Sequence, residues 1–308
     1  MSVSLSVLAP ITITDAMLTS SSAPENDYPA HNPATTYALG GRCISTITHR
    51  IYESGAAGNL NHDPTDILNR IGTPPWWIDV APTNKWAMFD GENNSQTSIA
   101  TPLTVVLHPG LFFSALYANG LEGETITVTV KDAPAGATVY SYTASLENSA
   151  PPDYWEWCWD PFIQQTDIIL SDIPPYANAE ITVTFSSASG TVRCGTLLLG
   201  GLKLLGETNF GAAAKPKTYS YIAIDDYGKT VIRRRPSAKD LSLTADVAIE
   251  RASYVLDTIT ALLDVPTVVI GTDLANYTGL RTFGLVTGEL NYNNPVKALL
   301  NLSVKGNI

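Results

Sequence analysis

Three tryptophans alternate with other residues in the segment Asp153–Pro161, at positions Trp155, Trp157 and Trp159. Side chains of an extended strand alternate between its two faces, so this spacing predicts that the three indole rings lie on one face. Indoles offer flat apolar area together with a polar N–H group. Such a row could pack in a core, bind a sugar or contact another subunit, and the residues alone leave these three alternatives open.

Two further tryptophans, Trp76 and Trp77, directly follow the prolines Pro74 and Pro75. Proline restricts the backbone and would help to present both rings. The pair is therefore a second candidate for a carbohydrate-binding or interface surface. We favour the interpretation that both rings are buried where a small N-terminal unit meets the following domain.

Asp90 begins an oxygen-rich segment that continues to Ser95. Calcium prefers roughly six to eight oxygen ligands, often from a loop, which makes Asp90 a candidate ligand of a structural calcium ion. The segment lacks the spacing of an EF-hand, and an Asx turn between two strands explains the same residues. We expect no other cofactor.

The sequence shows no clear set of catalytic residues. The sequence contains none of the patterns HExxH, GxSxG, Walker A or GxGxxG. Its histidines form no metal-binding or nucleophile-activating pattern and are expected to be ordinary structural or surface residues; they are His31, His49, His62 and His108. We therefore expect a protein that is not an enzyme.

Composition narrows the classes of partner. The chain has 308 residues and a net charge of −11 at pH 7. This charge argues against nucleic acid and against anionic membranes, because both attract basic surfaces. No apolar stretch approaches the ~20 residues of a membrane helix, so we expect no membrane insertion. The odd number of cysteines, without a CxxC motif, predicts neither a disulfide framework nor a zinc site and is typical of a reducing cytoplasm.

A basic strip interrupts this acidic background. It contains Lys229 and the consecutive arginines Arg233, Arg234 and Arg235. The three arginines are candidates for an assembly contact, because they could meet an acidic surface of a partner protein. A charged strand edge that faces solvent is the alternative interpretation.

The elements that position these residues fall into four parts. Residues 1–35 are predicted to form an N-terminal arm with an edge strand near Leu8–Thr14, ordered by a neighbour. Residues 36–84 form a small β unit with few residues for a core of its own. Residues 85–206 contain many short strands of alternating apolar and polar residues, separated by Gly and Pro turns, which predicts an antiparallel sandwich or jelly roll.

Residues 207–308 form the fourth part and change in character. Alternation predicts a strand at Leu241–Val247, and apolar residues from Ile249 to Leu263 recur at helical spacing. This part is therefore predicted to be an α+β domain with one helix on a sheet. Its further strands are expected at Thr267–Ile270, Arg281–Val286 and Ala298–Val304.

Several segments together resemble tail proteins of long-tailed bacteriophages, of the distal tail or upper baseplate type. The first resembles a chitin-binding-type module, the second and third resemble the opening and closing segments of a galactose-binding-like jelly roll, and the fourth resembles a tail-attachment domain. In that order the segments are Tyr37–Ser54, Trp77–Asp90, Cys194–Gly200 and Tyr227–Leu243. The order of the segments carries the resemblance, which covers roughly residues 5–308.

The resemblance implies a mainly β fold, with a galactose-binding-like jelly-roll sandwich followed by an α+β tail-attachment domain. It implies a structural protein of a tail tip or baseplate, made in the host bacterial cytoplasm and located in the virion tail. The expected partners are copies of the chain in a ring and other tail proteins. The alternative is a carbohydrate-binding protein that contacts host surface glycans, although this fold does not by itself establish sugar binding. In the assembled state we expect Trp155, Trp157 and Trp159 to be mostly buried.

Overall fold

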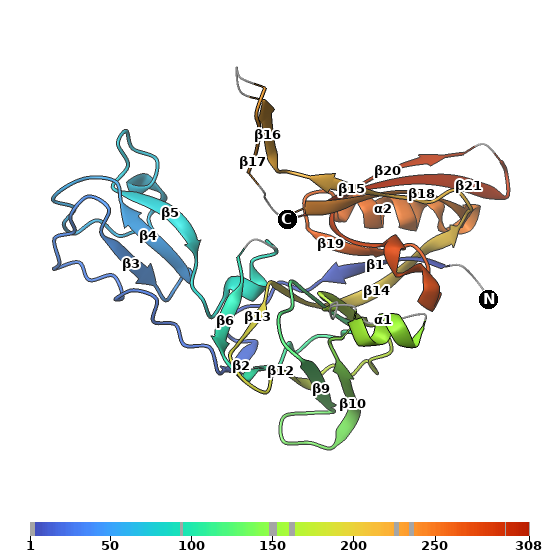
Figure 1. Cartoon of the computed structure of the whole chain (residues 1–308), viewed down its shortest axis with the longest axis horizontal. Helices are drawn as coiled ribbons and strands as arrows, with labels where there is room; N and C mark the ends of the chain where they lie inside the picture. Colours follow the sequence, from blue (N-terminus) through green and yellow to red (C-terminus); the bar gives the residue numbers. More distant parts are fainter. Residues whose placement is uncertain are drawn as a thin grey trace.

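The computed structural model describes residues 4–92, 95–147, 153–159, 164–224, 228–233, 237–292 and 294–307. The chain is mainly β, as predicted, and its strands form several separate sheets (Figure 1). Strands with one apolar face recur throughout. In β9 (Thr125–Lys131), for example, each second residue is buried, as alternation of apolar and Thr side chains requires.

The middle of the chain is consistent with a β-sandwich. Its first sheet has the order β10-β9-β12-β7-β2, and its second is formed by β11, β8 and β14. Buried residues such as Val128, Val183 and Leu199 belong to one hydrophobic core shared by the two sheets. The strands are β2 (Leu18–Ser21), β7 (Leu103–Leu107), β8 (Ala115–Asn119), β10 (Thr138–Ser145), β11 (Asp167–Leu170), β12 (Glu180–Ser186) and β14 (Thr196–Thr208), with a pair at the edge formed by β6 (Thr97–Ala100) and β13 (Thr191–Cys194).

The C-terminal part is an antiparallel sheet with a helix on one face. The helical spacing predicted from Ile249 appears as a short 3-10 turn, η3 (Ile249–Arg251), followed by α2 (Ala252–Ala261). Val255 and Ile259 of α2 are buried in a core with the sheet. The predicted strands are present as β18 (Ser237–Ala248), β19 (Thr267–Ile270), β20 (Arg281–Asn291) and β21 (Lys297–Gly306). A further strand, β15 (Ala213–Thr218), comes before β18 in the sequence, and the 3-10 turn η4 (Ala275–Leu280) lies between β19 and β20.

The first strand contradicts the predicted N-terminal arm. β1 (Ser4–Pro10) lies in the middle of the largest sheet, between β14 and β19. Leu5, Val7 and Leu8 are buried, so both faces of the strand are covered. Serines alternate with Leu5 and Val7, a pattern typical of a strand with one exposed face, but Ser6 is buried as well. The prediction of an edge strand near Leu8–Thr14 was therefore wrong.

The sandwich and the C-terminal part share one sheet. β14 pairs with β8 in the sandwich and, at its end, with β18 of the C-terminal part. The predicted boundary between residues 206 and 207 consequently falls inside a single strand. Since β1 also pairs along β14, the two parts are joined by main-chain hydrogen bonds and not by a linker.

The small unit is a separate lobe with a sheet of its own (Figure 1). A hairpin of β3 (Arg42–Ser45) and β4 (Arg50–Ser54) pairs with β5 (Trp77–Pro82). Its buried cluster is small and centres on Cys43, Tyr52 and Trp77. Two short 3-10 turns, η1 (Ile67–Asn69) and η2 (Ala87–Phe89), flank the last strand.

Candidate functional site

A hairpin that leaves the C-terminal sheet after β15 is exposed at nearly every residue of its two strands. Its strands, β16 (Tyr221–Ile224) and β17 (Thr230–Arg233), pair only with each other among the described strands. In Figure 1 the hairpin projects from the body of the molecule. An isolated pair of strands is marginally stable in water, so a hairpin of this kind gains from contact with another surface.

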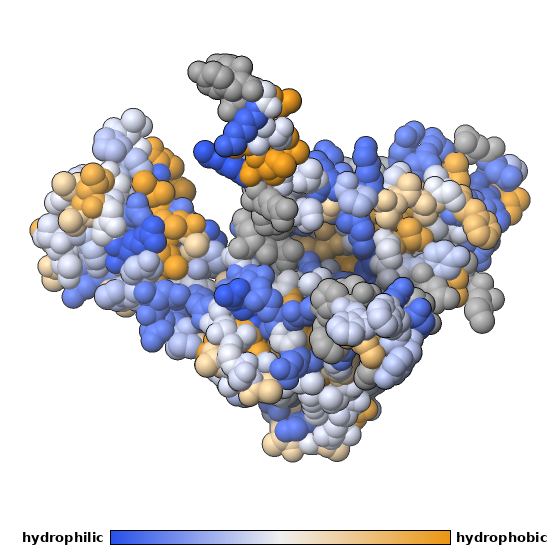
Figure 2. Space-filling view, viewed as in Figure 1, coloured by the Kyte–Doolittle hydropathy of each residue, from blue (hydrophilic) through white to orange (hydrophobic). Residues whose placement is uncertain are grey.

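The two faces of the hairpin differ. Ile222 lies opposite Ile232, and Ile224 lies on the same face because side chains alternate. These three side chains are 60%, 58% and 71% exposed, respectively. The other face carries Tyr221 and Arg233, which also lie opposite each other. Apolar side chains are visible on the hairpin beside hydrophilic ones in Figure 2. We call Ile222, Ile224 and Ile232 the isoleucine face.

The described part of the basic strip belongs to this hairpin. Arg233 ends β17 and is exposed, whereas Arg234 and Arg235 lie outside the described residues. Residues 219–236, between the sheet strands β15 and β18, contain four basic and two acidic residues, a net charge of +2, so the rest of the chain carries −13. The projecting region is therefore opposite in charge to the remainder of the molecule.

The tryptophan segment is a helix and not the predicted strand. α1 (Tyr154–Trp159) begins after Asp153, whose Oδ1 accepts a hydrogen bond of 2.8 Å from the N–H of Glu156. Such an N-terminal cap favours helical backbone over an extended one. Trp155 and Trp159 are four residues apart and so lie on one side of the helix, with ring centroids 5.8 Å apart.

The exposure of these rings excludes one of the three alternatives for them within a single chain. Trp155 and Trp159 are 72% and 71% exposed, so they do not pack in the core of the sandwich. The side chain of Trp157 lies outside the described residues. The burial expected for all three rings in an assembled state stays a prediction.

The other tryptophan pair is held within the small unit. Trp77 is fully buried, donates from Nε1 to the carbonyl of His62 at 2.8 Å, and meets the Tyr37 ring edge-on. Trp76 stacks on the His62 ring at 3.8 Å between centroids. The sequence predicted that both rings are buried where the small unit meets the sandwich. The rings instead pack inside the small unit. Burial of Trp77 removes it from any carbohydrate or interface surface.

The side chain of His49 connects the small unit to the segments beside the sandwich, through contacts that the sequence analysis did not predict. The Nδ1 of His49 lies 2.9 Å from a carboxylate oxygen of Glu25, and its Nε2 lies 3.0 Å from one of Asp15. The ring also stacks on Trp86 with centroids 4.1 Å apart. His49 was expected to be an ordinary structural histidine; its partners come from distant segments, and no sequence spacing could have indicated them.

Asp90 forms the predicted Asx turn. Its Oδ1 accepts from the N–H of Glu92 at 2.7 Å, and its Oδ2 accepts from the hydroxyl of Ser95. Partial burial raises the pKa of the Asp90 carboxyl, and the hydrogen bonds from Ser95 and Glu92 oppose that shift. Within the described part of the chain, no group of three or more His, Cys, Asp or Glu residues could hold a metal ion. A calcium ion at Asp90 therefore stays a prediction without a described ligand set.

Replacing Asp90 by alanine removes both hydrogen bonds and is expected to lower the free energy of unfolding by about 1–2 kcal/mol. Denaturant unfolding measures this change, and Glu92→Ala serves as a control because it keeps the N–H that Asp90 binds. If calcium is bound, a chelator should also lower the melting temperature of the wild type but not of the variant. An Asp90→Ala variant as stable as the wild type in both conditions would contradict both the turn and the calcium ion.

The two buried thiols are poorly suited to nucleophilic chemistry. Burial raises the pKa of Cys43 to about 12 and also raises the pKa of Cys194. A thiol must ionise to act as a nucleophile, so these two cysteines are structural. The absence of enzymatic activity stays a prediction, since a buried thiol says nothing about other groups.

Comparison with known proteins gives no family. No protein-family model matches the sequence, and the curated proteins contain no significant match. Among solved structures, the chain is similar to a chitosan-binding module 1 derived from a chitosanase/glucanase of Paenibacillus sp. IK-5, with 11% identity and a TM-score of 0.25. The alignment covers 38% of this chain and 83% of that one. A similarity this low supports no conclusion about fold or function. In addition, none of the described helices has the length and apolar character needed to span a membrane.

Proposed function

We propose that this protein is a structural subunit of a symmetric assembly, and specifically of the tail tip or baseplate of a long-tailed bacteriophage. Copies of the chain would form a ring, contact other tail proteins and remain in the virion tail. The segments quoted from the sequence suggest the phage tail, and the projecting hairpin supports an assembly.

The observation that carries the proposal is the exposure of the isoleucine face. Three isoleucine side chains on one face of a projecting hairpin leave a contiguous apolar surface in water. Contiguous exposed apolar patches mark interaction sites on soluble proteins. Side chains positioned for catalysis would instead converge in a cleft.

In this proposal the parts of the chain have separate roles. The C-terminal sheet with its hairpin docks in the ring as a tail-attachment domain. The sandwich adopts a galactose-binding-like jelly roll and points away from the ring axis, serving as a spacer or decoration. In Figure 1 the hairpin and the strands β9 and β10 project from opposite sides of the molecule, which suits this division.

The oligomeric state tests the proposal. Sedimentation of the purified chain over a range of concentrations should reveal a closed oligomer, and negative-stain images should show rings. A chain that stays monomeric at every concentration, alone and with the other tail proteins, would overturn the proposed function.

The arginine strip is expected to assist this docking. Replacing Arg233, Arg234 and Arg235 together by serine should reduce incorporation into particles while leaving the fold of the isolated chain intact. Charge contacts at the rim of an interface weaken with salt, so wild-type assembly should also weaken as ionic strength rises. Particle incorporation measured against a Lys203→Ser control would show the difference. Normal incorporation of the triple variant would show that the arginine strip does not contribute to assembly.

A carbohydrate-binding function is the second candidate, favoured by the exposure of Trp155 and Trp159. Aromatic faces can cover the apolar face of a sugar ring while nearby polar groups bind its hydroxyls. A glycan array followed by calorimetry tests this candidate. Trp155→Ala and Trp159→Ala should each abolish a specific hit, whereas Phe112→Ala, which removes another exposed aromatic ring, should not. The absence of any specific hit would remove this candidate.

A further inference from the structure

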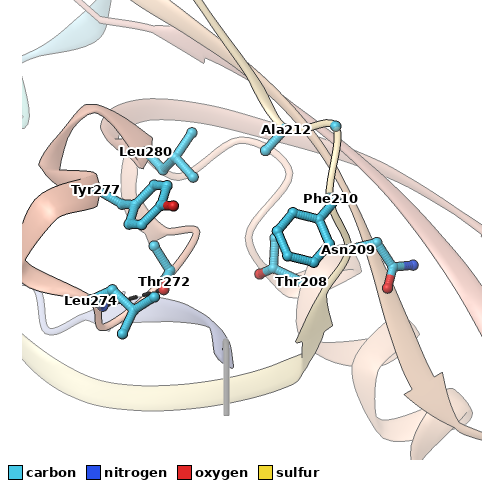
Figure 3. Close-up of a pocket in the computed structure, with 9 residues that line it drawn as sticks. Thr208, Asn209, Phe210, Ala212, Thr272, Leu274, Tyr277 and Leu280 are labelled. Carbon is cyan, nitrogen blue, oxygen red and sulfur yellow. Dashed lines mark hydrogen bonds between the residues drawn. The ribbon is translucent and has the colours of Figure 1, made fainter. Parts of the chain in front are cut away.

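A pocket lies beside the loop that precedes β15. Figure 3 shows Phe210 on one side of it and Leu274, Tyr277 and Leu280 on the other. The volume is about 280 Å³. That volume is just below the roughly 300–1,000 Å³ of pockets that enclose a whole small molecule, so the pocket suits one or two protein side chains. Phe210 is fully exposed, although burial would be favourable for its ring.

The hairpin and the pocket lie at opposite ends of one strand. Phe210 comes shortly before β15 (Ala213–Thr218), and the hairpin follows it. Six residues of strand span about 20 Å. Because the hairpin also projects from the body (Figure 1), its isoleucine face lies away from the pocket of its own chain.

The two surfaces match in apolar character and in charge. The isoleucine face is apolar, and so are the four side chains that frame the pocket. Residues 219–236, which include the hairpin, carry a net charge of +2. The exposed acidic residues Glu207 and Asp273 directly adjoin the lining residues Thr208, Thr272 and Leu274. Complementary charge around an apolar contact favours encounter and fixes its orientation.

We propose that the isoleucine face of one copy docks into the pocket of a second copy, framed by Phe210, Leu274, Tyr277 and Leu280. This inference rests on the proposed function and names the surfaces by which copies meet. A contact between two different surfaces is heterologous, so one copy of the pair keeps a free pocket and the other keeps a free hairpin. Addition of further copies then closes a ring or extends a filament.

Two variants test the proposal from its two sides. The hairpin variant carries Ile222→Asp and Ile224→Asp, and its matched control carries Ala223→Asp and Val231→Asp on the opposite face. The pocket variant carries Phe210→Ser and Tyr277→Ser. The replaced side chains of the two test variants are all exposed in the single chain, so both variants should fold with unchanged circular dichroism and melting temperature.

Sedimentation should show wild type and the matched control as oligomers, and each test variant as a monomer. The decisive measurement is an equimolar mixture of the two test variants. The hairpin variant still has a pocket and the pocket variant still has a hairpin, so the mixture should form a one-to-one dimer and nothing larger. Pairing of hairpin with hairpin would not give this result, because the pocket variant, whose hairpin is intact, would then form a dimer on its own.

The possible failures are distinguishable. If wild type stays monomeric at every concentration, alone and with the other tail proteins, both the proposed function and this inference are overturned. If wild type forms oligomers and either test variant does so equally well, the assembly stands and only the docking of hairpin into pocket is wrong. If both variants are monomeric but their mixture forms no dimer, the two surfaces do not bind each other, and this inference is also overturned.

Discussion

Removal of residues 1–10 is expected to abolish cooperative folding of the chain. This truncation deletes β1, which pairs with β14 on one side and β19 on the other. Leu5, Val7 and Leu8 are almost fully buried, and burial of each contributes about 1.5–3 kcal/mol. Their sum is comparable with the whole stability of a domain, about 5–15 kcal/mol. Loss of the near-ultraviolet circular dichroism signal and of a cooperative melting transition would report the effect.

Single substitutions in the same segment can distinguish whether it forms a central strand or a peripheral arm. Leu8→Ala should lower the free energy of unfolding by about 2–5 kcal/mol, because it opens a cavity in a covered strand. Thr12→Ala, at an exposed position just beyond the strand, should change it by less than about 0.5 kcal/mol. A truncated chain with the melting temperature of the wild type would show that the segment is the arm expected from the sequence.

The second large effect is expected at a glycine pair in β14. Gly200 is buried beside the end of β1, and a Cβ atom added to it would overlap with the main-chain carbonyl of Ala9. The neighbouring backbone cannot rotate away as a flexible side chain could, so β1 would have to shift. Overpacking of this kind usually costs about 1–3 kcal/mol, and a clash with backbone places Gly200→Ala at about 3 kcal/mol or more.

The adjacent residue provides a matched control. A Cβ atom on Gly201 would meet no other heavy atom within 4 Å. Gly201→Ala should therefore change the free energy of unfolding by less than about 1 kcal/mol, in either direction. Chemical denaturation of the two single variants tests this difference. Equal stability of both would mean that β1 does not approach β14 as closely as the structure has it.

The sequence predicted the strands and the helix whose one face is solvent-exposed. Ile126, Val128 and Val130 alternate with threonines because one face of β9 is buried. The spacing from Ile249 likewise predicted α2, which has one buried side. In each case one side of the element faces the core and the other faces solvent. The spacing of apolar residues along the local sequence reflects this difference.

The same pattern fails where that difference is missing. In β1, serines alternate with Leu5 and Val7, as in a strand with one exposed face, although both faces are covered. The aromatic residues of α1 alternate by chance with Glu156 and Cys158, while the cap at Asp153 favours a helix. Contacts between distant segments, such as those of His49 with Asp15 and Glu25, leave no trace in local spacing.

The candidate docking site was predictable only in part. The basic strip stands out in an acidic chain, and its member Arg233 ends β17 of the projecting hairpin. The pocket does not stand out, because Phe210 and Tyr277 come from segments that only the folded sheet brings together. The sequence of a short apolar strand does not show whether its side chains are buried or exposed. The exposure of the isoleucine face could therefore not be predicted from the sequence.

The position of β1 also sets the order of events during synthesis. Its neighbour β19 is far along the chain; the hydroxyl of Thr267 donates to the carbonyl of Leu8 across a separation of 259 residues. At roughly 5–20 residues per second, the ribosome needs about 13–50 s to supply that partner. Throughout this interval the Leu5–Leu8 segment, an apolar strand with unpaired edges, is available to other chains. A nascent-chain chaperone that binds such segments should therefore raise the yield of native protein without changing its final stability.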